Sequence, residues 1–295
     1  MPRATSLPGV SVLEFLAILL AGMAAGGINA MVGSGTLITF PVLLLLGYPP
    51  LVANVSNNIG LVPGGIGGIR GYRDELAGHT DTIKRLIPAS AAGAVTGALL
   101  LLVLPASAFK AIVPVLIALA LVLVITGPRL QAWAADREAR DGSPEVSESG
   151  DADLPEAVER AGAAERPAAA RPVGAGRMRL TFVGVFFAGI YGGYFGAAQG
   201  VLLIGIMSVL IAEPLQRINA FKNVLGTTVN GIAALVFLVV AWDKIDWTVV
   251  AAIACGALVG GYGGARLGRS LSPMVLRGVI VAVGTVAIVK LVAFG

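Results

Sequence analysis

The chain has 295 residues, of which 56% are hydrophobic and only 13% carry a charge, and its formal net charge is +4. This composition excludes an ordinary soluble domain and indicates an integral membrane protein. The surplus cations lie where apolar stretches end and form no basic stripe with aromatic residues, so we expect the lipid bilayer as a partner and no nucleic acid.

Apolar stretches long enough to cross a membrane recur along the chain. Roughly 20 residues at about 1.5 Å each cover about 30 Å of hydrocarbon. Two further apolar pieces, 36–47 and 200–212, are too short to cross upright, and each follows a long stretch after a turn that contains glycine. They predict two broken-helix hairpins. The long stretches are 11–31, 51–70, 83–104, 109–127, 180–198, 218–241, 247–268 and 273–294.

A hydrophilic segment divides these stretches into two groups. It is rich in Ala, Glu, Arg, Pro and Ser, holds nearly half of the charged residues, and has almost no large apolar side chain. It cannot bury enough surface to offset the entropy lost on ordering, so we predict a disordered cytoplasmic linker. The predicted organisation is a first transmembrane repeat over 10–127, the linker over 128–179, and a second transmembrane repeat over 180–295.

The two groups share one order of stretches, which is long, short, long, long, long. At an offset of about 165 residues Gly35 aligns with Gly200 and Pro49 with Pro214, which indicates an internal duplication. If each hairpin returns to the membrane side on which it starts, all cation-rich connections face the cytoplasm and the two repeats have inverted topology. If the short pieces instead re-enter the membrane from the far side, the two repeats are parallel. The expected fold class is an all-α polytopic membrane protein with two repeats of four to five hydrophobic segments each.

The two glycine turns, in "MVGSGTL" and "YFGAAQGVL", fall at membrane depth. A turn there cannot face lipid, because each unpaired backbone group would cost several kcal/mol, so it must be buried in protein or line a wet cavity. Each turn also begins a new helix, whose free N–H groups and positive dipole end suit an anion. The residues predicted to bind a small anionic substrate at these turns are Gly33, Ser34, Gly35, Thr36, Gln199 and Gly200.

The stretch after each hairpin carries polar side chains at unusual density. Amides in hydrocarbon are costly unless they pair, and at helical spacing most of these side chains share one face, which we expect to point inward. Lys222 either supplies a positive charge to the site or marks the cytoplasmic interface. The substrate-binding residues predicted from these two faces are Asn54, Ser56, Asn57, Asn58, Asn219, Lys222, Asn223 and Thr227.

The alternative reading is that these amides only join helices to one another. Glycines at four-residue intervals are interpreted as packing faces, because they let helix backbones approach closely. The sequence shows no nucleophile with a paired base, no complete phosphate loop and no Cys or His cluster, so no enzyme chemistry, cofactor or metal is expected. The packing glycines are Gly60, Gly64 and Gly68, and Gly256, Gly260, Gly264 and Gly268.

Two stretches carry a resemblance to a known family. "GGINAMVGSGTLITFPVLLLLGYPPLVANVSNNIG" and "GIYGGYFGAAQGVLLIGIMSVLIAEPLQRINAFKNVLGTTVNG" resemble the duplicated glycine turn, proline-containing helix and Ala/Asn/Ser signature of the sulfite exporter TauE/SafE family, also called the toluene sulfonate uptake permease family. The layout of two hydrophobic halves around a hydrophilic loop is also similar over nearly the whole chain. The turns are poorer in glycine than is usual there, and Ile206 stands where the first half has Pro41.

The resemblance implies a multi-pass permease of the bacterial cytoplasmic membrane for small sulfur-containing anions such as sulfite or organosulfonates. Export is expected, because an inside-negative potential drives a monoanion outward by roughly 2.3 kcal/mol per 100 mV. A non-transporting membrane scaffold and an anion channel are the alternatives. The sequence leaves open whether the chain forms a homo-oligomer.

Overall fold

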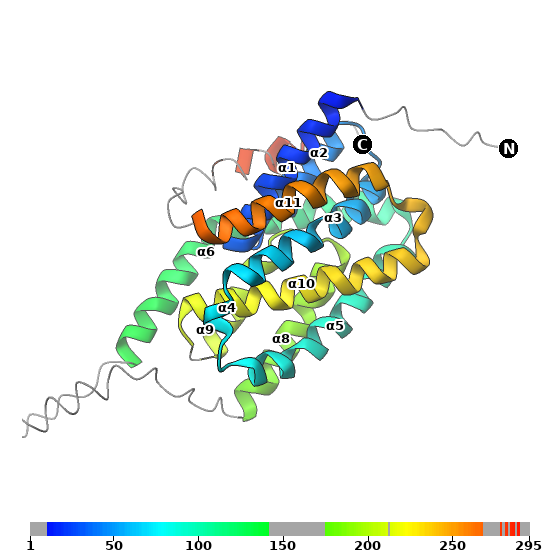
Figure 1. The fold of residues 1–295 in the computed structure, drawn as a ribbon. Coiled ribbons are helices and arrows are strands. Elements are labelled where there is room, and N and C mark those ends of the chain that lie inside the picture. The colour runs from blue at the N-terminus through cyan, green and yellow to red at the C-terminus, as the bar shows by residue number, and fades with distance from the viewer. Residues whose placement is uncertain are drawn as a thin grey trace, which may run out of the picture.

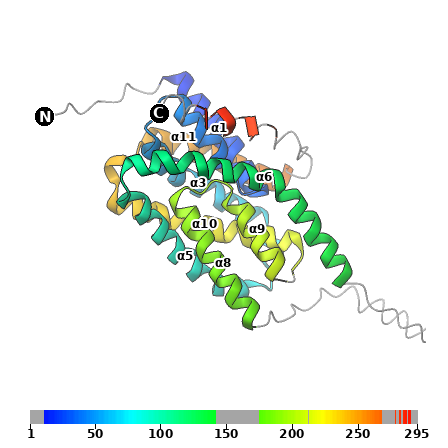
Figure 2. The same cartoon turned by 180° about the vertical axis from the view of Figure 1, so that it is seen from behind.

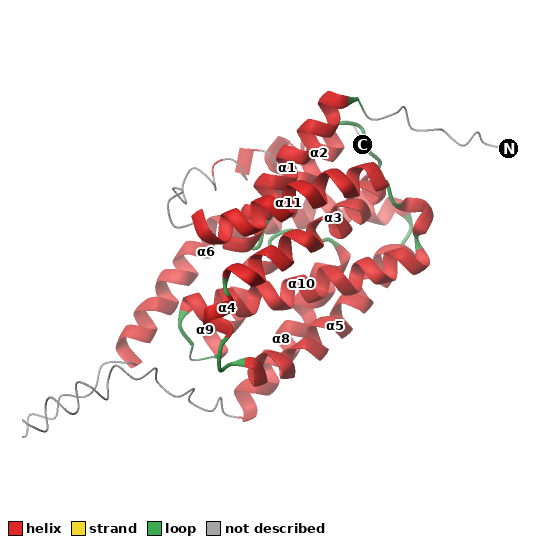
Figure 3. Cartoon of the chain, in the orientation of Figure 1, coloured by secondary structure: helices red, strands yellow, loops and turns green. Residues whose placement is uncertain are grey.

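A computed structural model describes residues 11–141, 175–211 and 213–267, and short pieces at 278, 281–282, 284–286 and 288–289. Every regular element in these residues is a helix, which confirms the all-α prediction (Figure 3). In chain order the elements are α1 (Val12–Met31), α2 (Thr36–Leu45), α3 (Pro50–Gly71), α4 (Arg73–Leu76), α5 (Thr80–Val103), α6 (Ala106–Asp141), α8 (Ala175–Tyr194), α9 (Gln199–Leu210), α10 (Leu215–Val240), the 3-10 helix η1 (Trp242–Lys244) and α11 (Trp247–Leu267).

The predicted apolar stretches coincide with these helices, except that the last one, 273–294, lies largely outside the described residues. Helices α2 and α9 are the two short apolar pieces, as predicted. Helix α3 is not among the helices apolar enough to span a membrane by composition alone, because amides and glycines occupy many of its positions. The described spans that meet this criterion are Val12–Met31, Thr80–Val103, Ser107–Gly127, Leu215–Val240 and Trp247–Gly264.

Local signals in the sequence fix several of the helix starts. Ser11 accepts a hydrogen bond from the backbone N–H of Glu14, and the Glu14 carboxylate accepts one from the Ser11 N–H, which is a capping box at the start of α1. Pro49 and Pro214 are the N-caps of α3 and α10. The alignment of these two prolines at an offset of 165 therefore places them at the same position of two helices.

Helix α6 is longer than the apolar stretch that predicts it. It continues to Asp141 and extends past the rest of the bundle (Figure 1). The predicted disordered linker spans 128–179, whereas α6 continues over 128–141 and α8 begins at Ala175, so the structure differs from that prediction at both ends. The reason at the first end is composition: residues 128–141 have four Ala and three Arg, which favour helix even where they cannot form a core. Residues 142–174 lie outside the described residues, and the domain boundaries stay predictions.

The two broken hairpins open toward opposite ends of the bundle. Helix α1 begins at the upper right and α8 at the lower left in Figure 1, and Figure 2 shows the same arrangement from behind. The Asp246 N–H, after α10, donates a 2.9 Å hydrogen bond to Ser56 Oγ near the start of α3. At the other end, His79 Nδ1 lies 3.6 Å from Glu213 Oε1, between α9 and α10. An inverted repeat requires this arrangement, although the repeat and its orientation in the membrane stay predictions.

Helices of the two halves pack reciprocally. The most extensive contacts join α1 to α11 and α5 to α8, so the first helix of each half lies against a late helix of the other half. Small residues allow this approach: a Cβ added to Gly26 would lie 2.3 Å from Ala257 O, and one added to Gly260 would lie 1.9 Å from Met23 O. The predicted packing role is confirmed for Gly60, Gly64, Gly256, Gly260 and Gly264, whereas Gly68 has looser neighbours and Gly268 lies outside the described residues.

Candidate functional site

The two glycine turns touch each other at the centre of the bundle. The Gly200 N–H donates a 3.0 Å hydrogen bond to Gly33 O, and a Cβ added to Gly33 would lie 2.3 Å from the Gly200 Cα. Behind the contact, the Phe40 ring of α2 meets the Phe195 ring edge-on, with their centroids 5.1 Å apart. The two turns are therefore in backbone contact, and the contact leaves no room for a side chain on either glycine.

Both turns end their first helix in the same way. Gly33 and Gly196 have φ values of +79° and +78°, and each N–H bonds the carbonyl five residues earlier, in Ile28 and Tyr191. Only glycine adopts this left-handed conformation at low cost. By geometry Gly33 thus corresponds to Gly196, so the two halves are 163 residues apart at the turns rather than the predicted 165. Helix α9 has 12 residues and α2 has 10, so the separation between the halves is 165 again at Pro49 and Pro214.

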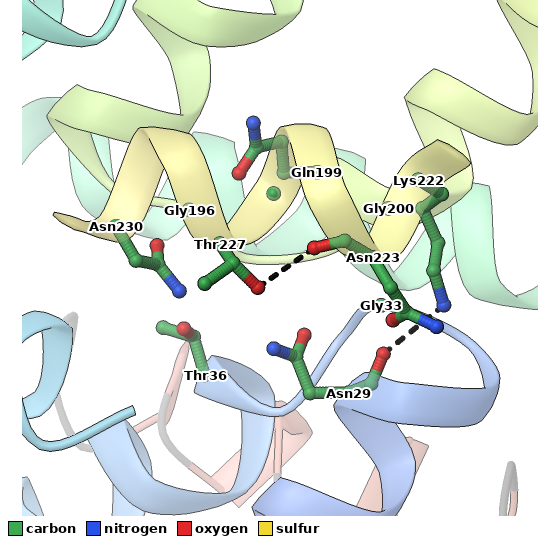
Figure 4. Close-up of a pocket in the computed structure, with 11 residues that line it drawn as sticks. Asn29, Gly33, Thr36, Gly196, Gln199, Gly200, Lys222, Asn223, Thr227 and Asn230 are labelled. Carbon is green, nitrogen blue, oxygen red and sulfur yellow. Dashed lines mark hydrogen bonds between the residues drawn. The ribbon is translucent and has the colours of Figure 1, made fainter. Parts of the chain in front are cut away.

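A polar pocket lies between the two turns and helix α10 (Figure 4). Its cavity volume is about 20 Å³, which is room for about one water molecule, and none of its lining residues is acidic. Helix α10 contributes one side through residues spaced three or four apart, as expected for a single helix face. The lining residues are Asn29, Gly33, Thr36, Gly196, Gln199, Gly200, Lys222, Asn223, Gly226, Thr227 and Asn230.

Lys222 and Asn223 bind the carboxyl end of α1. Lys222 Nζ donates to Asn29 O at 3.1 Å and to Ala30 O at 2.9 Å, and Asn223 Nδ2 donates to Ala30 O at 3.2 Å. The last carbonyls of a helix have no partner within it and carry partial negative charge, which a cation complements. An ammonium has three donors, and these bonds to Asn29 O and Ala30 O use two of them.

The structure brings seven of the predicted site residues to this pocket, but their side chains differ in direction. Thr36, Thr227 and Asn230 point toward a common space beside Asn29 (Figure 4). The Gln199 side chain turns away instead, because a Cβ on Gly192 of α8 would lie 2.3 Å from its Cδ. The predicted residues that line the pocket are Gly33, Thr36, Gln199, Gly200, Lys222, Asn223 and Thr227.

The polar face of α3 is used differently. Asn57 Nδ2 donates to Thr36 Oγ1 at 3.3 Å, and the Thr39 hydroxyl donates to Asn57 Oδ1, so this amide joins α3 to α2. Asn54 Nδ2 donates to Tyr194 O at 3.0 Å, at the end of α8. Ser56 Oγ accepts from the Asp246 N–H. These three side chains lie outside the pocket and connect helices.

The other predicted residues are also buried away from the pocket. Ser34 Oγ, Asn58 Oδ1 and Asn219 Oδ1 are buried oxygen atoms for which the described residues provide no hydrogen-bond partner. Gly35 packs against α1, since a Cβ there would lie 2.4 Å from Ala25 O. The structure therefore separates the fourteen predicted residues into a pocket group and a group that lies between helices.

The predicted substrate-binding set omits four lining residues, which are Asn29, Gly196, Gly226 and Asn230. Asn230 lies seven residues after Asn223, so the periodicity that marks the α10 face already contains it. Asn29 stands alone in an apolar helix, one turn before Gly33. Its position before a broken helix end is the signal that identifies it. The two glycines line the pocket through backbone, which no side-chain pattern reveals.

Comparison with known proteins gives one consistent result. A family model described as "Sulfite exporter TauE/SafE" matches residues 18–291. A probable membrane transporter protein of Haemophilus influenzae is 24% identical over 285 residues, which cover 95% of each chain, and the probable membrane transporter protein YfcA of Escherichia coli K12 is 26% identical over 292 residues, or 99% of this chain and 94% of that one. A probable membrane transporter protein, ORF9, of Sinorhizobium sp is 40% identical over 108 residues, which cover 35% of this chain and 40% of that protein. No solved structure matches the chain.

Proposed function

This chain belongs to the sulfite exporter TauE/SafE family, and from that membership we propose that it is a secondary transporter that exports small sulfur-containing anions, such as sulfite or organosulfonates, across the bacterial cytoplasmic membrane. Relatives that match over almost their whole length are named probable membrane transporter proteins. The chain is thus a multi-pass membrane transporter, and the substrate and the direction are the proposed part.

The observation that carries the proposal is the pocket between the two turns. Lys222 gives it a positive charge, and the Thr227 hydroxyl donates within α10 to Asn223 O at 2.7 Å. Thr36 and Asn230 add a neutral hydroxyl and an amide, and no lining side chain is acidic. Oxyanions accept hydrogen bonds from such donors, and bonds that involve a charged partner are the stronger ones. A cation would meet the Lys222 charge without a carboxylate to offset it, so the arrangement favours an anion.

The central pocket also bears on the two alternative functions, a non-transporting scaffold and an anion channel. A scaffold that uses its amides only to join helices has no need of a polar pocket at its centre, whereas a transporter requires one. An open channel is disfavoured by the backbone contact of Gly33 with Gly200, which closes the space between the turns. Transport would then proceed by movement of the helices around a central site, as in other transporters with broken helices.

Flux measurements in proteoliposomes test the proposal directly. We expect the purified protein to release loaded sulfite or methanesulfonate faster than protein-free liposomes, and an inside-negative potential to accelerate the release of a monoanion. Sulfate, thiosulfate and longer organosulfonates are tested in the same way. A reconstituted, folded protein that moves none of these anions would contradict the proposed function, and a potential-independent flux would contradict the export mechanism.

The hydrophilic segment between the halves is expected to be dispensable for transport. Because the segment has charge but no apolar core, replacing residues 142–174 by a flexible Gly/Ser connection of similar length should leave anion flux in liposomes within about twofold of wild type. The replacement begins after Asp141 so that helix α6 stays intact. Loss of flux in a variant that still elutes as a folded protein would show that the segment acts in transport.

A further inference from the structure

Lys222 is an unusual cation in this fold because it is buried. Its exposed fraction is 2%, whereas the side chain of Lys244 is 45% exposed beside Asp243. The Glu213 side chain, at 6% exposed, is also buried among the described residues, but it is paired with Arg217. No carboxylate in the same residues forms an ion pair with Lys222; the recorded pairs involve Arg73, His79, Arg217 and Lys244. Its partners are the two carbonyls of α1.

The helix ends around Lys222 add little net charge. Each turn joins the carboxyl end of one helix to the amino end of the next, so about −0.5 and about +0.5 of an elementary charge come together in each hairpin. The bond from the Gly200 N–H to Gly33 O brings the start of α9 onto the end of α1 as well. These partial charges of opposite sign largely cancel. The full charge that remains in the site is that of Lys222.

Other titratable groups near the site do not change this balance. The Tyr191 hydroxyl, on α8, donates to Ala197 O in the second turn. At the start of α10, the Glu213 carboxylate pairs with Arg217 and faces His79. None of these side chains lines the pocket, and the pocket's own lining is otherwise neutral. A ligand in the pocket therefore meets one positive charge and a set of uncharged donors.

We propose that Lys222 determines the charge of the substrate, so that the site accepts anions with a single negative charge, such as a sulfonate or hydrogen sulfite, and discriminates against dianions such as sulfate. The inference rests on the proposed function of this pocket. A monoanion beside the Lys222 ammonium makes a neutral pair. A dianion leaves one negative charge buried without a partner, which is costly in a site away from water.

Methanesulfonate and sulfate form a matched pair of probes, because both are tetrahedral, have similar size and differ by one charge. The experiment measures counterflow of labelled methanesulfonate in wild-type proteoliposomes and its inhibition by unlabelled methanesulfonate or sulfate. We expect sulfate to inhibit at least tenfold more weakly. Equal inhibition by the two ions would overturn the proposal while leaving anion transport established. Absence of any anion flux in the wild type would instead overturn the proposed function.

Sulfite gives a second arm that needs no variant, since it gains a proton near neutral pH and becomes a monoanion. Its apparent affinity should rise as pH is lowered through neutrality, in step with the fraction of hydrogen sulfite. Methanesulfonate does not titrate in this range, so any change in its affinity reports a change in the protein, and the ratio of the two affinities isolates the protonation of sulfite. A ratio of sulfite affinity to methanesulfonate affinity that stays constant over this pH range would overturn the proposal.

Variants then test the residue itself. Lys222→Met should weaken methanesulfonate at least tenfold and remove the preference over sulfate, whereas Lys244→Met, at the exposed lysine, should change neither. Asn230→Lys places a second cation in the lining and should improve the relative affinity for sulfate. A preference for methanesulfonate that survives in folded Lys222→Met would overturn the role of Lys222. If Lys222→Met does not fold, the comparison of methanesulfonate with sulfate in the wild type and in Asn230→Lys still tests whether the positive charge of the site sets the substrate charge.

Discussion

Replacing Gly33 by alanine is expected to abolish anion transport and to destabilise the folded protein. The added Cβ would lie 2.3 Å from Gly200 Cα and 3.0 Å from its nitrogen, and both are backbone atoms that cannot rotate away. The substitution also forces a non-glycine residue into a left-handed conformation, which costs about 1–2 kcal/mol on its own. The turns must separate to relieve the clash. Thermal stability in detergent and counterflow in liposomes measure the two effects.

Two glycines provide matched controls for this substitution. Gly47 has φ of +91° but no neighbour within 4 Å of an added Cβ, so Gly47→Ala carries the conformational cost without the clash. Gly231 lies inside α10, outside the pocket lining and with open space around it, so Gly231→Ala tests a glycine of the same helix without either effect. Both controls should retain transport. Wild-type activity in Gly33→Ala would mean that the contact between the turns is not required.

The second large effect is expected at Asn223, where leucine should lower anion affinity by several-fold to about a hundredfold. The side chain lines the pocket and donates to Ala30 O, so its loss removes a donor whose net value is about 1 kcal/mol, or roughly 1.5–3 kcal/mol with a charged partner. Asn57→Leu is the matched variant in α3. It should lower thermal stability and leave the affinity of the folded fraction unchanged, because Asn57 bonds Thr36 and Thr39 rather than facing the pocket.

Both quantities have to be measured on each variant. An Asn223→Leu protein with wild-type affinity and lowered stability would assign Asn223 to helix packing and remove it from the site. Reduced affinity in Asn57→Leu at wild-type stability would show that the α3 face also contacts the substrate in some state of the transport cycle. Asn57 and Asn223 occupy comparable positions in the helices after the two hairpins. Comparing their leucine variants therefore measures the effect of their different hydrogen-bond partners.

Helix positions were predictable because membrane thickness constrains length. An apolar run of about 20 residues has few alternatives in a bilayer, and short runs beside a glycine turn are recognisable as halves of a broken helix. The end of α6 was not predictable from this rule, since residues 128–141 have few large apolar side chains and become helical through the intrinsic preference of Ala and Arg. The length rule predicts where a helix crosses the membrane, but it does not predict where that helix ends outside the membrane.

The site could be predicted only in part. Glycine turns and a polar helix face are visible in the sequence, and Gly33, Gly200 and Lys222 do meet. The polar side chains of α3 have similar spacing, yet they bind α2, the end of α8 and the segment before α11. A partner of Asn57 lies 21 positions away, whereas those of Asn54 and Ser56 lie 140 and 190 positions away. A pattern within one helix therefore predicts that a face is buried but not what covers it.

The reciprocal packing of the two halves also has a consequence for how the protein is made. Helix α1 is synthesised first, but its most extensive partner, α11, is the last of the long helices described. At translation rates of roughly 5–20 residues per second, the glycine surface of α1 waits on the order of 10–50 s for that partner. During this interval Gly26 has no Ala257 to contact. The α5–α8 pair can form as soon as α8 is made, whereas a nascent chain that stops before α11 leaves α1 without its principal partner.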